Sequence, residues 1–488
     1  MTKTMAKTKI LILGAGPAGL SSAYRLSAKG FEISIIETDP SQVGGLSKTI
    51  NHNGYLVDIG GHRFFSKSQE VNNFWKEILP DDFLTISRYS RIYYQNIFFD
   101  YPLKPFQCLM RLPYSKSLRI IYSFLKSKTE LDKKITNLEE WFTHKFGKEL
   151  YLTFFKSYTE KVWGLKCKEI SKDWASQRIQ DLSVFSILKN SILNFLKVRP
   201  SQVIKTLSTS FLYPRKGPGM FWDRCAEVCK ERGVDFHFNT ICTELSYDNI
   251  IGKWGGQFKK NDQIFGLQNF DYVISSIPVP TLVECIQSIN NSQVSDLIEK
   301  FKFRDFIMVL AVLKKKNTLK DNWIYIHNEN VQVGRIQIFN NWSDEMVVRP
   351  DEHTSLGLEF FCQESQGLWN ETDEKIIELS KAELLELKLS DVDDNFVETK
   401  VIRVKKAYPV YHNNYVDDLE KLKKIISKAA PNVYMIGRNG MHRYNNQDHS
   451  IMTAFVVADN IITNTFARDP WKVNQEAVYI ESDECSVV

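Results

Sequence analysis

The sequence lacks the features that mark several special classes of protein. Its eight cysteines form no CxxC pair, and Cys225 and Cys229 have no histidine support, so we predict cysteines packed in the core and no metal site. No uninterrupted apolar run reaches the roughly 20 residues that a membrane-spanning helix needs. No signal-peptide pattern precedes the first apolar strand, at residues 10–13. These absences predict a soluble, cytoplasmic protein.

The chain also lacks a strong excess of charge. It contains 63 Lys and Arg against 58 Asp and Glu, a net charge of +5 over 488 residues. A basic tail is absent, so we predict no nucleic-acid partner, whereas an anionic small-molecule ligand fits the mild positive balance. With 43% hydrophobic residues, a chain of this length is expected to form two or three domains.

A glycine-rich turn stands near the N-terminus. The run "KILILGAGPAGL" places Gly14, Gly16 and Gly19 in a GxGxxG turn between an apolar strand and a helix. Such glycines allow a tight turn, the approach of a pyrophosphate to the backbone, and close packing of helix and strand. The next strand, "EISIIE", ends in Glu37, which is placed to bind both hydroxyls of an adenosine ribose. This favours FAD or NAD over NADP.

A second glycine pair follows soon after Glu37. Gly44 and Gly45, in "VGGLSK", stand where a plain dehydrogenase would begin its next crossover helix. A glycine pair here lets the chain pass close to an extended cofactor, although an ordinary tight turn is the alternative interpretation. We therefore predict FAD.

These motifs resemble the FAD-binding superfamily that contains amine oxidases, protoporphyrinogen oxidase, phytoene desaturases and UDP-galactopyranose mutase. The mutase branch is matched by "VDIGGHRFFSK", which resembles the segment that passes a histidine, His62, beside the flavin. The run "YTEKVWGLKCKEISKDWASQRI" resembles the mutase segment with a substrate-domain tryptophan, Trp163, and an arginine, Arg178. Arg304 stands where the family has an arginine next to the substrate diphosphate, and Tyr408 matches a Tyr-Pro-Val tyrosine.

The resemblance implies roles for particular residues of this chain. The implied catalytic residues are Arg304, Tyr408, Tyr444 and His62, and the implied substrate-binding residues are Trp163, Arg178, Arg304 and Tyr408. The implied cofactor-binding residues are Gly14, Gly16, Pro17, Ala18, Gly19, Glu37, Gly44, Gly45, Leu46, Gly61, His62, Gly437, Arg438, Asp448, His449 and Ser450.

The last flavin motif has a physical interpretation of its own. In "MIGRNGMHRYNNQDHSIMTAF" a buried strand leads into Gly437 and Arg438, and a helix then begins with Asn446 or Asp448 available as its cap. The positive end of this helix would stabilise negative charge on a reduced flavin. A capped amphipathic helix after a turn is the alternative.

One departure from the mutase pattern concerns the expected diphosphate clamp. The family has a second arginine shortly after the first, but the corresponding run "RIQDLSV" carries Leu182. The clamp is therefore incomplete unless Arg215 or Lys216 replaces it.

We predict an α/β fold with a Rossmann-like FAD-binding domain of the GR2 type, a helical insertion domain and an antiparallel-sheet substrate domain. The predicted segments are FAD-binding at 8–85, 206–290 and 426–468, substrate sheet at 86–104 and 291–425, a helical substrate domain at 105–205, and a C-terminal tail at 469–488. Residues 351–400 are either a lid or a structural elaboration. The run at 183–198 belongs to the helical domain or forms an amphipathic helix facing lipid or a partner.

Three functions are weighed. The resemblance favours an enzyme that interconverts pyranose and furanose forms of a nucleotide sugar in cell-surface glycan biosynthesis. Its catalyst would be N5 of reduced FAD, with no protein nucleophile. The alternative is an FAD-dependent oxidoreductase acting on an amine, a polyene or a glycan precursor, which the lost arginine favours. A non-catalytic flavin-binding or nucleotide-binding protein is the third. The expected partner is a small-molecule substrate, and the helical region offers surface for a homodimer or for peripheral membrane contact.

Overall fold

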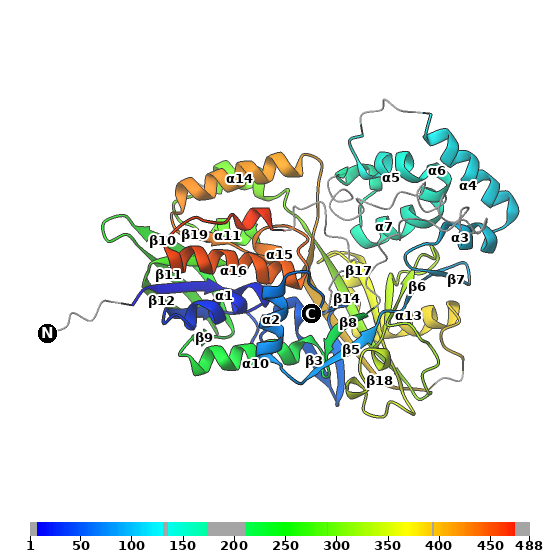
Figure 1. The fold of residues 1–488 in the computed structure, drawn as a ribbon, viewed down its shortest axis with the longest axis horizontal. Helices are drawn as coiled ribbons and strands as arrows, with labels where there is room; N and C mark the ends of the chain where they lie inside the picture. Colours follow the sequence, from blue (N-terminus) through cyan, green and yellow to red (C-terminus); the bar gives the residue numbers. More distant parts are fainter. Residues whose placement is uncertain (1–6, 130–134, 173–209, 290, 393–394, 474–488) are drawn as a thin grey trace.

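The computed structural model describes residues 7–129, 135–172, 210–289, 291–392 and 395–473. Two large sheets lie side by side, and a group of helices, α3 to α7, stands at the end of the second sheet (Figure 1). The fold is therefore of the predicted α/β class, with a unit built on a parallel sheet, a unit built on a second sheet and a helical unit. No helix within these ranges is long and apolar enough to cross a membrane.

The first sheet is parallel and collects strands from distant parts of the chain. In spatial order it contains β19 (Val433–Met435), β13 (Tyr272–Ser275), β1 (Lys9–Leu13), β2 (Glu32–Ile36) and β9 (Asp235–His237). Strand β1 is buried along nearly its whole length, as a parallel strand covered on both faces must be. Strand β13 pairs with β1 and β19 pairs with β13, although both follow β1 by hundreds of residues, so one sheet joins distant parts of the chain.

Alternate residues of β1 face two different layers. Ile10 and Ile12 pack with helices α1 (Pro17–Ser27), α10 (Pro218–Glu231) and α16 (Gln447–Thr463). Leu11 and Leu13 face the other layer, which is formed by β10 (Thr240–Asp248), β11 (Lys253–Lys260), β12 (Gln263–Phe270), α11 (Val279–Cys285), α12 (Asn291–Ile298) and α14 (Tyr415–Ala429). Cys225 and Cys229 of α10 are fully buried in the first layer, where they pack as apolar side chains.

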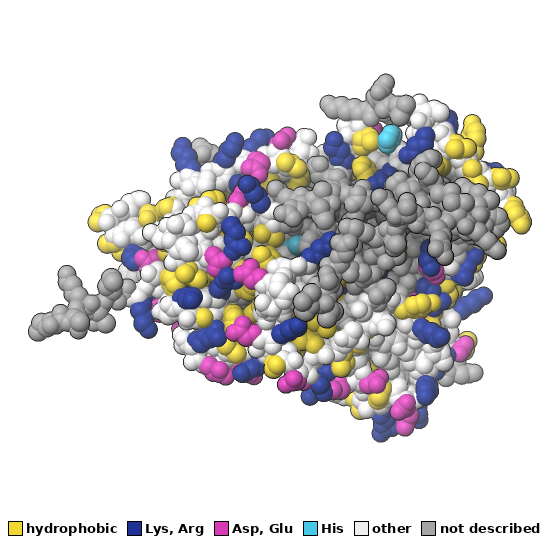
Figure 2. All heavy atoms as spheres, in the orientation of Figure 1, with side chains coloured by type: hydrophobic (Ala, Val, Ile, Leu, Met, Phe, Trp, Pro, Cys, Tyr) yellow, Lys and Arg dark blue, Asp and Glu magenta, His cyan; other side chains and the backbone are white. Residues whose placement is uncertain are grey.

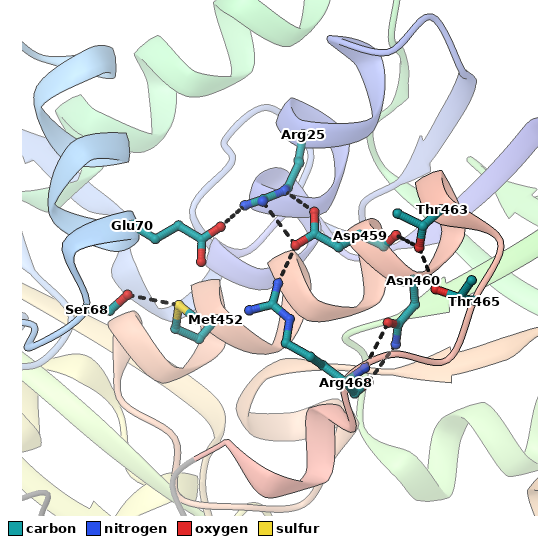
Figure 3. Close-up of polar contacts among 9 residues, drawn as sticks. All are labelled: Arg25, Ser68, Glu70, Met452, Asp459, Asn460, Thr463, Thr465 and Arg468. Carbon is teal, nitrogen blue, oxygen red and sulfur yellow. Dashed lines mark hydrogen bonds and ion pairs between the residues drawn. The ribbon is translucent and has the colours of Figure 1, made fainter.

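A charged network fastens the helices of the first layer (Figure 3). Arg25 of α1 pairs with Glu70 of α2 (Gln69–Ile78) at 2.5 Å and with Asp459 of α16 at 2.6 Å. Arg468, beyond the end of α16, forms a second ion pair with Asp459. The network therefore ties three helices from separate parts of the sequence.

Several short elements belong to neither of the two large sheets. They are η1 (Gly45–Ser47), β3 (Thr49–His52), β4 (Tyr55–Asp58), β5 (Phe83–Ser87), β8 (Ser210–Pro214), α15 (Gly437–Gly440) and η7 (Pro470–Lys472). Strand β3 pairs with β4, and β5 with β8, in two antiparallel ribbons.

The second sheet has seven strands. Their order is β18 (Phe396–Pro409), β14 (Phe303–Leu313), β17 (Thr354–Cys362), β16 (Arg335–Ile338), β15 (Trp323–Ile326), β6 (Ser90–Tyr94) and β7 (Ile97–Asp100). It is antiparallel except that β15 and β6 run parallel. This one parallel pair departs from the predicted antiparallel sheet. It arises because β6 comes from the N-terminal part of the chain, so no hairpin sets its direction relative to β15.

The two faces of this sheet have different roles. Phe306 and Met308 of β14 face the layer that contains Trp163 and Tyr408, whereas Ile307 and Val309 face helix α13 (Asp373–Glu386). Short 3₁₀ turns complete the unit at η4 (Phe339–Asn341), η5 (Asp344–Met346) and η6 (Gly367–Asn370). The segment 351–400 thus supplies a central strand and a covering helix, so it is a structural elaboration.

The helical unit contains α3 (Pro105–Arg111), α4 (Tyr114–Ser127), α5 (Leu138–Phe146), α6 (Lys148–Leu150), the π-helical turn η2 (Tyr151–Phe155), α7 (Lys156–Trp163) and η3 (Cys167–Glu169). Helix α7 ends at Trp163. The next residue, Gly164, has a left-handed φ of 64°, which turns the chain back toward the seven-stranded sheet. The predicted helix at 183–198 lies outside the described residues.

Candidate functional site

Two glycine segments pack against each other at the carboxyl end of β1. Gly14 has a φ of +96°, and a Cβ atom placed on Gly19 would stand 1.9 Å from the carbonyl oxygen of Gly14. A Cβ on Gly45 would stand 3.1 Å from Cα of Gly16, and the N–H of Gly44 donates to the carbonyl of Ala15 at 2.9 Å. Backbone this free of side chains fits the pyrophosphate of a dinucleotide at the start of α1.

Glu37 stands beside the glycine turn. Its Oε2 accepts a hydrogen bond from the N–H of Ala15 at 2.7 Å, and its Oε1 accepts from the N–H of Asp39 at 2.8 Å. Oε1 also accepts from Oγ1 of Thr38 at 3.3 Å, whereas Oε2 keeps a further lone pair, which can accept a ribose hydroxyl. The arrangement therefore fits an adenosine ribose, as the sequence predicts, and also shows that Glu37 braces the turn.

The end of the chain returns to the same place. Gly437 has a φ of +76°, and a Cβ on it would stand 2.8 Å from the Cβ of Ala18 in α1. Its N–H donates to Oγ1 of Thr453 in α16 at 3.0 Å, and its carbonyl accepts from Nδ2 of Asn445 at 3.0 Å. The late motif thus joins the N-terminal glycine turn to α16.

The first turn of α16 is buried. The N-cap of α16 is Asn446 and not Asp448, the other candidate in the sequence. The N–H of Asn446 donates to Nδ1 of His449 at 3.1 Å, and Oγ of Ser450 donates to the carbonyl of Asn446 at 3.0 Å. Burial raises the pKa of Asp448 to about 7, while a hydrogen bond from Ser66 and the nearby Arg63 oppose the rise. These side chains hold the helix start in place.

Three aromatic side chains meet where α7 and β18 end. Tyr408 and Tyr444 are stacked, with ring centroids 5.7 Å apart and planes inclined by 20°. Trp163 presents its edge to both rings at 6.3 Å, and the guanidinium of Arg438 lies 4.7 Å from the centroid of Tyr444. Leu46 belongs to the same apolar cluster. We call Trp163, Tyr408 and Tyr444 the aromatic wall.

Arg438 packs on the aromatic wall, and His62 lies near Arg438. Nε of Arg438 donates to the carbonyl of Asn445 at 2.8 Å, and Nη1 donates to the carbonyl of Ala407 at 3.2 Å. Burial and the nearby Arg438 lower the pKa of His62 to about 3, and Arg335 adds to the effect. His62 is therefore a neutral imidazole at neutral pH.

Arg304 reaches the wall from β14, where it pairs in register with Tyr408. Nε of Arg304 donates to the carbonyl of Val162 at 3.1 Å, and Nη2 donates to the carbonyls of Lys161 at 3.3 Å and Phe361 at 2.9 Å. Within the described part of the chain its Nη1 makes no hydrogen bond, so two N–H donors are left for a ligand. Burial lowers the pKa of this guanidinium below its usual value.

Not every predicted residue is placed at the wall. Arg178 and Leu182 lie outside the described residues. Arg215, the suggested replacement cation, pairs with Asp82 at 3.0 Å and Glu345 at 3.4 Å, so two carboxylates already neutralise it.

A buried ion pair behind Tyr408 was not predicted from the sequence. Arg335 of β16 holds Glu359 of β17 through two hydrogen bonds of 2.8 and 2.5 Å, and Gln337 donates to the same carboxylate at 2.8 Å. Nη2 of Arg335 also donates to the hydroxyl of Tyr408 at 3.3 Å. The sequence does contain a sign of this pair. Glu359 is the single charged residue in the run "TSLGLEFFC", and a carboxylate in a buried strand requires a partner.

Comparison with known sequences gives a family for most of the chain. Residues 17–437 match the family described as flavin-containing amine oxidoreductases. A stretch of 57 residues is 46% identical to the 4,4'-diapophytoene desaturase of Methylomonas sp, covering 12% of this chain and 11% of that protein. A stretch of 65 residues is 31% identical to protoporphyrinogen oxidase 2 of Arabidopsis thaliana, covering 13% of each chain. The matched stretches are thus a small part of these curated relatives.

Solved structures share the fold over nearly the whole chain. A crystal structure of reduced UDP-galactopyranose mutase gives a TM-score of 0.81 at 23% identity, covering 96% of this chain and 99% of that one. A fatty acid isomerase from P. acnes gives a TM-score of 0.62 at 12% identity, covering 94% and 99%. The chain therefore has the fold of the mutase, and by its sequence it belongs to the family of flavin-containing amine oxidoreductases, which implies a flavin cofactor (FAD).

Proposed function

We propose that this protein is an FAD-dependent mutase that interconverts the pyranose and furanose forms of a nucleotide sugar, with the flavin reduced. The observation that carries the proposal is the aromatic wall with cationic groups beside it. Flat aromatic faces suit a base or a sugar ring, and guanidinium donors suit a diphosphate. The likeness of the fold to UDP-galactopyranose mutase supports the same choice.

Different residues around the aromatic wall would bind different parts of the nucleotide sugar. Trp163 and Tyr444 would stack on the nucleotide sugar, and the Nη1 group of Arg304 would bind a diphosphate oxygen. Tyr408 is held by Arg335, so its ring keeps one orientation. When bound, reduced FAD supplies the electron-rich centre for opening and closing the sugar ring. His62 stays neutral, so it adds no positive charge of its own beside Arg438.

The test is a titration with UDP and UDP-galactose, first with the flavin oxidised and then with it reduced by dithionite. Tighter binding in the reduced state and a furanose product by chromatography are expected. Arg304→Ala should abolish binding of the nucleotide sugar. The matched control is Arg403→Ala on β18, where Arg403 bonds Asp373 of α13 on the other side of the sheet. Unchanged UDP affinity in Arg304→Ala would sink the mutase proposal.

An oxidoreductase is the second candidate, and one observation favours it. Three donated hydrogen bonds bind Arg304 to backbone carbonyls, so only one of its nitrogens serves a diphosphate, and the second arginine of the mutase pattern is replaced by Leu182. The matched relatives include a desaturase and a protoporphyrinogen oxidase. Two results together would establish the oxidoreductase instead. The flavin spectrum would not change on addition of nucleotide sugars in either redox state, and an amine or a polyene would reduce the oxidised flavin.

A further inference from the structure

Helix α4 presents a row of large apolar side chains to the solvent. Tyr114 is 91% exposed, Leu118 67%, Tyr122 71% and Leu125 61%, and Ile121 is 43% exposed in the same row. Hydrophobic side chains gather at the end of the molecule where α3 and α4 lie (Figure 2). We call these five side chains the α4 face. So many large apolar groups together exceed the scattered exposure that is normal on a protein surface.

The α4 face is one continuous stripe of the helix. Its residues follow one another at intervals of four, three, one and three, the spacing of a single helical face. Ile120 and Phe124 lie on a different side and are buried in the helical unit. The burial of Ile120 and Phe124 therefore holds α4 in place, and the α4 face takes no part in that packing.

The charged residues of α3, α4 and their connection have one sign. Between Asp100 and Glu130 the sequence contains no Asp or Glu, whereas it contains six cations: Lys104, which pairs with Asp100 at 2.7 Å, and Arg111, Lys116, Arg119, Lys126 and Lys128. Arg119 and Lys126 are exposed on α4 itself. An apolar stripe with cations and no carboxylates is complementary to a surface that is apolar inside and anionic outside.

We propose that the α4 face docks on a lipid bilayer that contains anionic lipids, with the helix lying in the plane of the interface. The apolar side chains would enter the boundary between headgroups and acyl chains, and the cations would stay at the level of the lipid phosphates. At fourteen residues α4 is about 21 Å long, which is shorter than the roughly 30 Å of a hydrocarbon core. A symmetric pairing with a second copy is disfavoured, because it would bring the cations of both copies together.

The experiment is co-sedimentation of the full-length protein with vesicles of phosphatidylcholine alone and of phosphatidylcholine with phosphatidylglycerol. Binding to the anionic vesicles is expected, with loss at high salt. The double variant Leu118→Gln/Leu125→Gln should reduce partitioning by about tenfold or more, because each leucine loses the free energy of its burial in the interface. Arg119→Gln/Lys126→Gln should reduce binding to anionic vesicles and leave the salt dependence weaker.

The matched control is Ile250→Gln/Ile264→Gln. Ile250, in the turn between β10 and β11, is 95% exposed, and Ile264 of β12 is 66% exposed. Both belong to the small three-stranded sheet and not to the helical unit. This control should bind vesicles as the wild type does, and all variants should keep their melting temperatures because the replaced side chains are exposed. Equal loss of vesicle binding in Leu118→Gln/Leu125→Gln and in the control Ile250→Gln/Ile264→Gln would overturn the proposal, as would the absence of vesicle binding by the wild type. Light scattering could instead show that the wild type is a dimer and that only Leu118→Gln/Leu125→Gln dissociates it. In that case a second copy of the chain, and not a bilayer, covers the α4 face.

Discussion

Gly437 and Ala18 lie in contact although they come from opposite ends of the chain, since a Cβ on Gly437 would stand 2.8 Å from the Cβ of Ala18. Gly437→Ala should therefore push the late segment away from α1 and weaken the cofactor site. We expect purified Gly437→Ala to lose most of its flavin, measured as the ratio of absorbance at the flavin band to that of protein.

The control for Gly437→Ala is Gly233→Ala. Gly233 has a φ of +84°, so alanine costs about 1 kcal/mol of backbone strain there too, but a Cβ meets no atom within 4 Å. Gly233→Ala should keep its flavin. Equal flavin loss in the two variants would show that backbone strain, and not the contact with Ala18, is responsible.

The Arg335–Glu359 pair should show strong coupling. Glu359 is fully buried, so Arg335→Ala leaves an unpaired buried charge and should cost about 3–5 kcal/mol of unfolding free energy. Adding Glu359→Gln should recover part of that loss, because no uncompensated charge is left. Urea unfolding of both single variants and the double variant measures the coupling, and strictly additive effects would contradict the expected dependence.

The buried carboxyl of Asp58 should make stability depend on pH. Its neighbours are Tyr213 and Thr49, which both donate hydrogen bonds to it, yet burial raises its pKa to about 7. The unfolded carboxyl titrates near 3.9, so between about pH 4 and pH 7 the unfolded state releases a proton that the folded state keeps. The unfolding free energy from this group therefore falls as pH rises, by up to about 1.4 kcal/mol per pH unit, and is level above pH 7.

Comparison with Asp58→Asn isolates this contribution, since the variant cannot release the proton. The advantage of the wild type over the variant should shrink from about pH 5 to about pH 7 in urea unfolding. Burial also lowers the pKa of His327 and His442 to about 3, which has the opposite sign, but both histidines are present in both proteins and cancel in the difference. A difference that is independent of pH would contradict the raised pKa of Asp58.

Asp459 joins two arginines, so its removal should cost more than the loss of an isolated surface pair (Figure 3). Asp459→Asn should lower the unfolding free energy by about 1–2 kcal/mol. Glu227→Gln, which removes one exposed partner of Arg224, should cost clearly less, because both side chains are solvated and the pair is screened. Thermal melts of the two variants check this, and equal small shifts would show that the network adds nothing beyond its single pairs.

The sequence predicted best what depends on neighbouring residues. The glycine turn at Gly14 and the start of α16 after Asn446 are local features, and each stands where its motif places it. The fold followed because these local units occur in the order of a known superfamily.

Features set by the pairing of distant strands were not predictable in the same way. The bond between Arg335 and Glu359 depends on the register of β16 and β17, and the orientation of Arg304 depends on where α7 ends. Exposure on α4 was also hidden, because apolar residues lie on its buried and its exposed sides alike and the sequence does not say which side is covered.

The five-stranded sheet, with β1 and β19 at its two ends in sequence, also has a consequence for synthesis. The glycine turn that follows β1 is translated hundreds of residues before β13 and β19, the two strands that complete the sheet on one side of β1. Gly437 and α16 follow β19 in the sequence. The turn therefore leaves the ribosome long before the segments that pack against it, so we expect a chain truncated before Gly437 to be unable to retain a cofactor.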